Sequence, residues 1–405
     1  MKKVFFGLLF YFIFSFNSYS QHTNLLLGRN YSSDINRVLY TSKEYAHTSF
    51  KPIIKSNLSF EIDSIIDNYY SNVDKNWFLR KVFSEHLIVL KGDDYKLTAS
   101  PIINFSVGKE FVNSKPTFTN TRGYLIEADL GEKLSFSTSF YENQAVFSNY
   151  LDLYIRNNQI VPGQGYARNF KETGFDYAMS SGYVTYKTND IFTFQFGHGK
   201  NFIGDGYRSL LLSDNTFNYP YLKIQTTFWK IQYTNLYAEL MDIRYFKTHM
   251  LPNWDQIGYP KKYLSSHYLS INLNKNFNFS LFEAVVWRMN HAPGSRGFDI
   301  NYLNPIALLR PLEFSINSPD NVLLGINTKY AFKRSYMYGQ VVLDEFSISE
   351  LLNDNDWWAN KIGYQLGYKI FNPFNINRLT FQTEYNYVRP YTYAHHNPQQ
   401  NYAHY

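Results

Sequence analysis

A strict alternation of large apolar and small polar residues is the feature of this sequence that most constrains its fold. Within the segment 134–141, one face carries leucine and phenylalanine and the other carries mainly serine. The same period of two recurs in the segments 192–196, 269–281, 362–368 and 379–387. Because successive side chains of a strand point to opposite faces, this pattern predicts β-strands with one apolar and one polar face. We therefore expect an all-β protein, with Phe136 on the apolar outer face and Ser137 on the inner face.

The polar faces of these segments differ from the water-facing side of a soluble sheet. They carry Ser, Asn, Gln, Gly and Glu, whereas lysine gathers near the segment ends, at Lys133, Lys187, Lys275, Lys329 and Lys369. The chain is also 19% aromatic, with Tyr 37 and Phe 35. Membrane barrels need many aromatic residues at their two lipid–water interfaces and polar residues in their lumen. The pattern favours a large antiparallel transmembrane outer-membrane β-barrel over a soluble sandwich or a secreted sugar-binding protein.

The length of the alternating region sets the size of this barrel. From residue 97 to 405, at about 9–11 residues per tilted strand plus connections, it accommodates about 14–18 strands. A barrel of that width has a lumen that either water or chain must fill. The long connections 245–265 and 289–320 are candidates for surface loops or for inward folds.

The first residues have the three-part pattern of a secretory signal peptide. Lys2 and Lys3 precede the apolar run Val4–Phe14, and Ser18 and Ser20 stand like the −3 and −1 positions of a cleavage site. The apolar run is about half of the ~20 residues that span a bilayer, which disfavours a membrane anchor. The chain has Cys 0, so an exported protein of this kind must gain its stability from a large fold rather than from disulfides.

These observations divide the chain into regions. We expect a signal peptide over 1–20, a periplasmic, plug-like amino-terminal segment over 21–86 outside the barrel wall, and an outer-membrane β-barrel over 87–405. The segment after the signal peptide lacks any period, and only a weak helical pattern appears at 76–85.

A glycine-rich stretch, GHGKNFIGDGYRSLLLSDN, runs from 197 to 215. It begins with G-x-G, but no helix follows it, since Pro220 and several asparagines interrupt the chain, and no Lys-Ser/Thr follows the glycines. Both the dinucleotide and the Walker patterns therefore fail. The net charge of +6 is spread without a long basic run, which gives no support for a nucleic-acid partner. Gly204 and Gly206 instead permit close backbone approach.

The same stretch resembles the G…G-x-G-x-R-S-L-L-L-S-D signature of the Wzi-like capsule-assembly outer-membrane proteins, and more closely the gliding-motility RemB branch of the Bacteroidota. Further segments similar to that branch are 80–110, 304–327, 338–346, 357–369 and 384–405. The resemblance implies a barrel with an occluded lumen that binds or organises surface polysaccharide, with a supporting role in gliding motility or adhesion. Members of the branch continue beyond the position of Tyr405 into a further strand, so we expect this chain to be a fragment.

Charged residues are expensive on a lipid-facing surface and are expected to pair inside a barrel. We expect Arg208 to pair with Asp205, Asp214, Asp344 or Glu345. Because Asp344 and Glu345 are adjacent, a single strand cannot turn both inward without a bulge or an end. Two acids across a sugar would also fit glycosidase chemistry, but salt bridges to arginine are favoured. The full set of expected lumen or ligand-binding residues is Asp205, Arg208, Asp214, Arg310, Glu313, Gln340, Asp344, Glu345 and Arg389, with Trp357 and Trp358 as interface anchors or sugar-stacking residues.

Other chemistries find little support in the sequence. His395 and His396 lie in a loop without carboxylates at metal-ligand spacing, and no G-x-S-x-G is present. We therefore expect no metal, no cofactor and no enzymatic activity. The expected partners are outer-membrane lipid, surface polysaccharide and the barrel-assembly machinery, and not nucleic acid. The alternatives are a passive porin-like diffusion channel and, with less support, an outer-membrane hydrolase.

Overall fold

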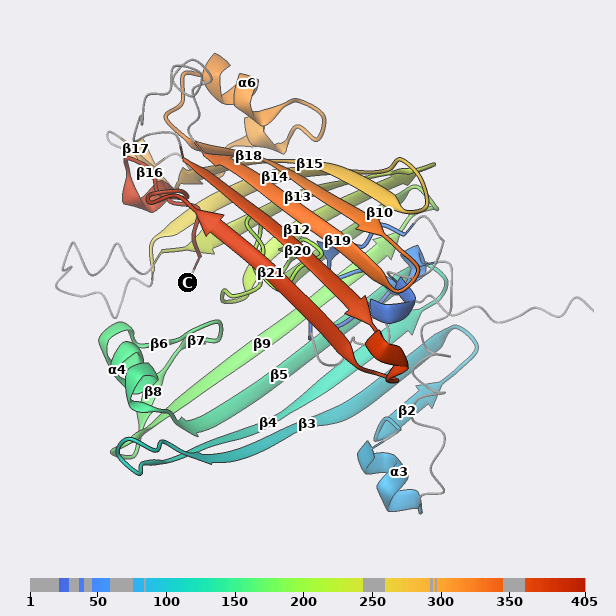
Figure 1. Cartoon of the computed structure of the whole chain (residues 1–405), viewed down its shortest axis with the longest axis vertical. Coiled ribbons are helices and arrows are strands. Elements are labelled where there is room, and N and C mark those ends of the chain that lie inside the picture. The colour runs from blue at the N-terminus through green and yellow to red at the C-terminus, as the bar shows by residue number, and fades with distance from the viewer. Residues whose placement is uncertain are drawn as a thin grey trace, which may run out of the picture.

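One antiparallel sheet of 15 strands dominates the protein and curls around a filled interior (Figure 1). The computed structural model describes residues 22–28, 36–39, 46–58, 76–83, 85–242, 259–291, 294–295, 297–344 and 361–404. Every pair of neighbouring wall strands is antiparallel, and almost all of them follow one another in sequence. The predicted all-β class, the antiparallel pairing and the size of the sheet are therefore confirmed.

The wall is a meander in which each strand pairs with the next. In order of pairing, its strands are β2 (Ile88–Lys91), β3 (Tyr95–Lys109), β4 (Pro116–Leu130), β5 (Leu134–Val146), β9 (Gly174–Lys187), β10 (Phe192–Gly199), β12 (Tyr219–Phe228), β13 (Ile231–Met241), β14 (Lys261–Asn272), β15 (Phe277–Arg288), β18 (Asn321–Ala331), β19 (Ser335–Asp344), β20 (Ile362–Phe371) and β21 (Thr380–Val388), while β8 (Arg168–Phe170) pairs with β9.

The sheet is open within the described part of the chain. Its two ends, β2 and β21, are not paired with each other there, so the expected closure into a barrel is not seen. All residues of β2 and most of β21 are exposed, and each of these strands has a neighbouring wall strand on one side only.

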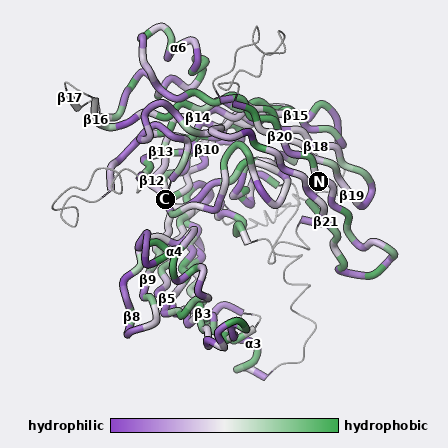
Figure 2. Tube along the Cα trace, turned by 60° about the vertical axis from the view of Figure 1, so that its left-hand side comes forward, coloured by the Kyte–Doolittle hydropathy of each residue, from purple (hydrophilic) through white to green (hydrophobic). Residues whose placement is uncertain are grey.

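The predicted two-faced character of the strands is present. In β10, Phe196 is 67% exposed on the outer side, whereas its neighbour Gln195 is 1% exposed on the inner side. Ser137 of β5 is likewise buried, while Phe136 is half-buried on the opposite face. Colouring by hydropathy shows the same mixture of apolar and polar residues along the wall (Figure 2). The outer face is thus mainly apolar, and the inner face carries most of the polar side chains.

The connections differ in length between the two ends of the sheet. At one end, called the short-turn end, strands are joined by short turns such as 131–133, 229–230 and 332–334. The other end, called the long-loop end, carries the connections 147–173, 200–218 and 289–320 (Figure 1). These connections and the regions outside the wall contain α3 (Trp77–Phe83), α4 (Asn149–Asn158), α6 (Leu309–Ser315), β1 (Phe50–Lys51), β6 (Ile160–Val161), β7 (Gly165–Tyr166), β11 (Phe202–Ile203), β16 (Asn290–His291), β17 (Gly294–Ser295), η1 (Lys55–Asn57), η3 (Ile300–Leu303), η4 (Pro373–Asn375) and η5 (Pro398–Gln400). Within the described ranges, no helix is long and apolar enough to cross a bilayer.

Three segments fill the interior of the sheet, which we call the lumen. They are the amino-terminal segment (22–28 and 46–58), the inner loop (200–218) and the carboxy-terminal segment (389–404). The amino-terminal segment pairs through β1 with β11 of the inner loop, not with a wall strand. The carboxy-terminal segment lies over the inner loop, where the Tyr402 hydroxyl donates to the Leu211 carbonyl at 2.6 Å.

An apolar core lies inside the lumen, where the inner loop meets the wall. Leu210, Leu211 and Leu212 pack against inward-facing residues of the strands from β12 to β19. The wall residues of this core are Tyr219, Tyr221, Leu236, Ala238, Leu240, Leu264, Tyr268, Phe282, Ala284, Val286, Leu323 and Val342. Such packing excludes water and fixes the loop as part of the folded structure.

Candidate functional site: the occluded lumen

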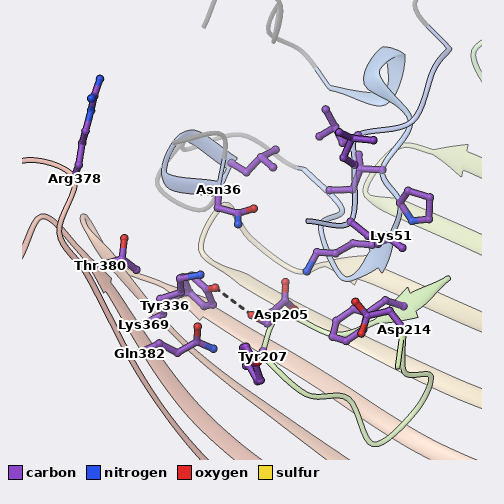
Figure 3. A pocket seen from close by; sticks show the side chains of 18 of the residues that line it. Asn36, Lys51, Asp205, Tyr207, Asp214, Tyr336, Lys369, Arg378, Thr380 and Gln382 are labelled. Carbon is purple, nitrogen blue, oxygen red and sulfur yellow. Dashed lines mark hydrogen bonds between the residues drawn. The ribbon is translucent and has the colours of Figure 1, made fainter. Parts of the chain in front are cut away.

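Asp205 lies where the inner loop meets the amino-terminal segment and the wall. It is 3% exposed, and its carboxylate accepts hydrogen bonds from Thr48 Oγ1 at 2.9 Å and from Asn327 Nδ2 at 3.3 Å. Its backbone carbonyl accepts from the Tyr336 hydroxyl at 3.1 Å (Figure 3). Lys329 of β18 donates to the same Thr48 hydroxyl at 2.6 Å. Asp205 therefore joins the inner loop to the amino-terminal segment and to the wall.

Lys51 supplies a half-buried positive charge beside this carboxylate. Its Nζ donates to the Gly204 carbonyl at 2.7 Å. Burial lowers the pKa of Lys51 to about 8, and the attraction of Asp205 opposes that shift. Figure 3 shows Lys51 and Asp205 reaching the same cavity from two segments that are far apart in sequence. A charge that is removed from water needs an opposite charge or hydrogen-bond partners. The Asp205 carboxylate and the lysines around it therefore stabilise each other in the folded protein.

The wall holds the backbone of the inner loop through side-chain amides. Gln340 of β19 accepts from the Leu210 N–H at 2.8 Å and donates to the Ile203 carbonyl at 2.9 Å. Gln365 of β20 donates to the Arg208 carbonyl at 3.1 Å. Because each buried backbone group needs a partner, these amides replace the pairing that the loop loses by leaving the sheet.

Glu384 of β21 is the carboxylate that binds the tip of the inner loop. Its Oε2 accepts from the Tyr207 N–H and from the Tyr338 hydroxyl, both at 2.7 Å. Its Oε1 accepts from the Arg208 N–H at 3.1 Å and from Asn386 Nδ2 at 2.9 Å. Hydrogen bonds to an ionised carboxylate are stronger than those between neutral groups, so Glu384 is a strong anchor for the loop.

The glycines of the loop allow this close approach, as the sequence indicated. Gly204 has a φ of +148°, and a Cβ there would lie 2.7 Å from Gln340 Nε2. A Cβ on Gly206 would lie 2.3 Å from Glu384 Oε2 and 2.6 Å from the Tyr338 ring. At these glycines the wall side chains can therefore lie directly against the loop backbone. No helix follows β10 in the described residues 200–218, so the strand–turn–helix arrangement of a phosphate site is not present there.

We predict that Gly206→Ala lowers the free energy of unfolding by about 1–3 kcal/mol, because the added methyl group forces Glu384 or Tyr338 out of place. The measurement is the urea midpoint of the folded protein in detergent micelles. Gly199→Ala is the matched control, since the nearest atom to a Cβ there lies 3.8 Å away. Equal midpoints for the two variants would contradict the proposed contact.

Arg208 forms no ion pair with Asp205, Asp214 or Asp344, three of its four predicted partners. Its side chain is exposed, with Cζ 5.3 Å from the centroid of the Tyr207 ring. Within the described residues no carboxylate lies within salt-bridge distance of it; Glu345, one of the predicted partners, lies outside them. The reason is geometric, because Asp205 and Arg208 lie on opposite sides of the loop and Asp205 is already held by Thr48.

The other predicted residues occupy several places. Arg310 and Glu313 pair with each other on α6, with Nη1 and Oε2 2.9 Å apart, rather than with the inner loop. Asp344 is fully buried, and its Oδ2 accepts from the Tyr393 N–H at 2.7 Å, so it holds the carboxy-terminal segment. Arg389 follows β21, and its N–H donates to the Ile362 carbonyl. The structure brings Asp205, Asp214, Arg208 and Gln340 together around the inner loop, and Trp357 and Trp358 lie outside the described residues.

Sequence reasoning missed several residues of this site. Glu384 and Asn327 stand on the polar faces of their strands, so an inward carboxylate and amide could have been read from the alternation. Thr48 and Lys51 lie in an aperiodic segment that gives no such signal.

The inner loop separates two cavities. The first has a volume of about 570 Å³ and a mixed lining, in which the charged residues Lys51, Asp205, Asp214, Lys369 and Arg378 stand beside apolar ones such as Leu25, Ile53 and Phe202 (Figure 3). The second has a volume of about 600 Å³ and lies between the loop and the carboxy-terminal segment. It is lined mainly by leucine and tyrosine, including Leu210, Leu211, Leu212, Tyr219, Tyr393 and Tyr402. In the part of the chain that the structure describes, no cluster of side chains is suited to hold a metal ion.

No protein-family model and no curated protein sequence matches the chain. Among solved structures it is similar to Wzi of Escherichia coli, an outer-membrane protein involved in group 1 capsule assembly and a carbohydrate-binding β-barrel. The identity is 12% over 93% of this chain and 75% of Wzi, with a TM-score of 0.41. It is also similar to OccK5 of Pseudomonas aeruginosa, with 12% identity, coverage of 74% and 75%, and a TM-score of 0.38. OmpF of Salmonella typhi shows 11% identity, coverage of 74% and 92%, and a TM-score of 0.31. At these TM-scores the likeness is too loose to assign a family or a ligand.

Proposed function

We propose that this protein is a non-enzymatic outer-membrane β-barrel with an occluded lumen, which binds or organises surface polysaccharide at its long-loop end. The occlusion is the observation that carries the proposal. The inner loop is held by Glu384, Gln340 and Gln365 from the wall and by Asp205 contacts to the amino-terminal segment. A diffusion channel needs a continuous aqueous path, whereas this lumen contains a packed apolar core.

The outer face of the wall supports a membrane location. Residues on it remain exposed although they are large and apolar, such as Phe105 at 68%, Val107 at 74% and Phe196 at 67%. A soluble protein rarely exposes an apolar surface of this extent, whereas lipid covers it in an outer-membrane barrel. In such barrels the short turns face the periplasm and the longer loops face outward, which places the long-loop end at the cell surface.

The polysaccharide role rests on the resemblance of the sequence motifs to the capsule-assembly proteins. Exposed aromatic residues at the long-loop end, such as Tyr150 on α4 and Tyr391 in the carboxy-terminal segment, are suited to stack on sugar rings. A supporting role in gliding motility or adhesion rests on the resemblance to the RemB branch alone. Hydrolysis is disfavoured, because the Asp344 carboxylate already holds the Tyr393 backbone.

Planar-bilayer recordings test the occlusion directly. We predict that the purified wild-type protein gives no stable conductance steps, while replacing residues 204–215 by a short Gly-Ser linker produces open channels. The control removes a surface segment of the same kind, residues 150–157 of α4, which lies at the long-loop end outside the lumen. Steady conductance of the wild type would favour the porin-like channel instead.

Cell-surface polysaccharide tests the binding role. Deleting the gene is expected to shift polysaccharide from the cell-attached to the released fraction without reducing the total amount. Because Asp344 has no catalytic role in this proposal, Asp344→Asn is expected to leave the attached and the released amounts unchanged. Unchanged attachment in the deletion strain would overturn the polysaccharide role while leaving the occlusion intact.

A further inference from the structure

The second cavity has walls that do not suit a sugar. Its leucines present only carbon atoms, and its two carboxy-terminal tyrosines have used their hydroxyl groups, since Tyr393 donates to the Leu210 carbonyl at 2.7 Å and Tyr402 to the Leu211 carbonyl at 2.6 Å. Neither hydroxyl is therefore free to donate to a ligand, and the tyrosines offer mainly their ring faces. A pyranose needs several hydrogen-bond partners for its hydroxyl groups, and burying those groups without partners is costly.

Two further hydroxyl groups of this cavity, those of Ser209 and Thr216, are also occupied within the chain. The Ser209 hydroxyl donates to the Ile203 carbonyl and accepts from the N–H groups of Leu211 and Leu212 at 3.1 Å. The Thr216 hydroxyl donates to the His404 carbonyl at 3.0 Å. The cavity therefore offers mainly apolar surface to an incoming molecule.

Arg208 differs from these groups, because it lines the cavity with a charged side chain that has no carboxylate partner among the described residues. Glu384 lies close in space to the Arg208 backbone, but it is not such a partner, since each of its two oxygens already accepts two hydrogen bonds. No aspartate or glutamate is among the described residues that line this cavity. His404 also lines it and stays neutral at pH 7, because burial lowers its pKa to about 4. A permanent positive charge thus stands at the edge of an apolar cavity.

We propose that the second cavity binds an apolar monocarboxylate, with a medium-chain fatty acid as the representative ligand. The chain of the ligand lies against Leu210–Leu212 and the tyrosine rings, and its carboxylate forms the ion pair that Arg208 lacks among the described residues. A cavity of about 600 Å³ is within the usual size range for small-molecule sites. The guanidinium matches a carboxylate with two parallel hydrogen bonds, which gives the head group a defined position. This site goes beyond polysaccharide binding and does not depend on it.

Calorimetric titration with decanoate tests the proposal on the full chain held in amphipol, where free detergent does not compete. The expected result is one bound decanoate per chain. Decanol, which lacks the charge, and glucuronate, which lacks the apolar body, are both expected to bind at least about tenfold more weakly, because each loses one of the two components of recognition.

Two variants separate the charge from the cavity. Arg208→Ala is expected to weaken decanoate binding by about tenfold or more while leaving decanol unchanged. Val388→Trp, at a residue of β21 that lines the cavity, is expected to weaken the binding of both ligands by filling the space. Arg334→Ala is the matched control, since Arg334 is an exposed arginine at the short-turn end. Absence of decanoate binding to the wild type, equal loss in Arg334→Ala, or stronger binding of glucuronate than of decanoate would each overturn the proposal.

Discussion

Asp205→Ala is expected to lower the free energy of unfolding by about 3–5 kcal/mol, because removal of one partner of a buried charge network leaves the others uncompensated. The variant deprives Thr48 and Asn327 of their acceptor and leaves the half-buried Lys51 and the buried Lys329 without the neighbouring carboxylate. Urea unfolding in detergent micelles, followed by tryptophan fluorescence, measures the loss.

The matched control for this variant is Asp190→Ala. Asp190 lies in the turn between β9 and β10 with a fully exposed side chain, 3.5 Å from Lys187 Nζ. Exposed ion pairs of this kind contribute about 0–1 kcal/mol, so a small change is expected. A loss in Asp205→Ala no larger than that in the control would show that the lumen contacts do not depend on the carboxylate.

The loss in Asp205→Ala is also expected to depend on pH. The folded pKa of Lys51, about 8, is below its unfolded value of 10.5. Between these two pH values the unfolded chain holds more protons than the folded chain, so the wild-type free energy of unfolding increases from about pH 8 to pH 10.5. Without Asp205 the folded pKa falls further, so the rise begins at lower pH. Loss of the Lys51 charge then relieves part of the destabilisation. The difference in free energy of unfolding between variant and wild type is therefore expected to narrow as pH rises. A gap that stays constant from pH 7 to pH 10 would contradict this account.

Phe196→Arg is expected to cost about 2–4 kcal/mol if the outer face of β10 meets lipid, because a charged side chain is most expensive near the bilayer midplane. Phe192→Arg on the same face is the matched comparison. Phe192 begins β10 beside the short turn, so its side chain lies nearer the interface and the expected cost is about 0–1 kcal/mol. Unfolding from lipid or detergent measures both. Small, equal costs would indicate that water, not lipid, covers this face.

The sequence was sufficient for features that depend on neighbouring residues. The alternation in β10 predicted which side chains face outward, because the two faces of a strand follow directly from its period. The glycines at 204 and 206 indicated close backbone approach, since glycine alone removes the Cβ that would block it.

The partners of the lumen charges could not be predicted in the same way. Arg208 and Asp205 are three positions apart, but the loop turns them into different cavities, and no periodic pattern describes that turn. Glu384 reaches Tyr207 across a separation of 177 residues, which only the curvature and register of the sheet determine. Lys51 lies in a segment without any repeat, and its role depends on β11, with which its segment pairs.

The sequence separation of the lumen contacts has a consequence for the order of folding. Wall strands pair mostly with their neighbours in the chain, so each hairpin closes a short loop and can form early. The hydrogen bond between Lys329 and Thr48 instead joins residues 281 positions apart, and it needs β18 in place before it can form. The entropy lost on closing such a long loop is offset only when many distant contacts form together. We therefore expect refolding in two kinetic phases, in which the strand signal appears first and the docking of the amino-terminal segment and the inner loop follows as a slower, cooperative step.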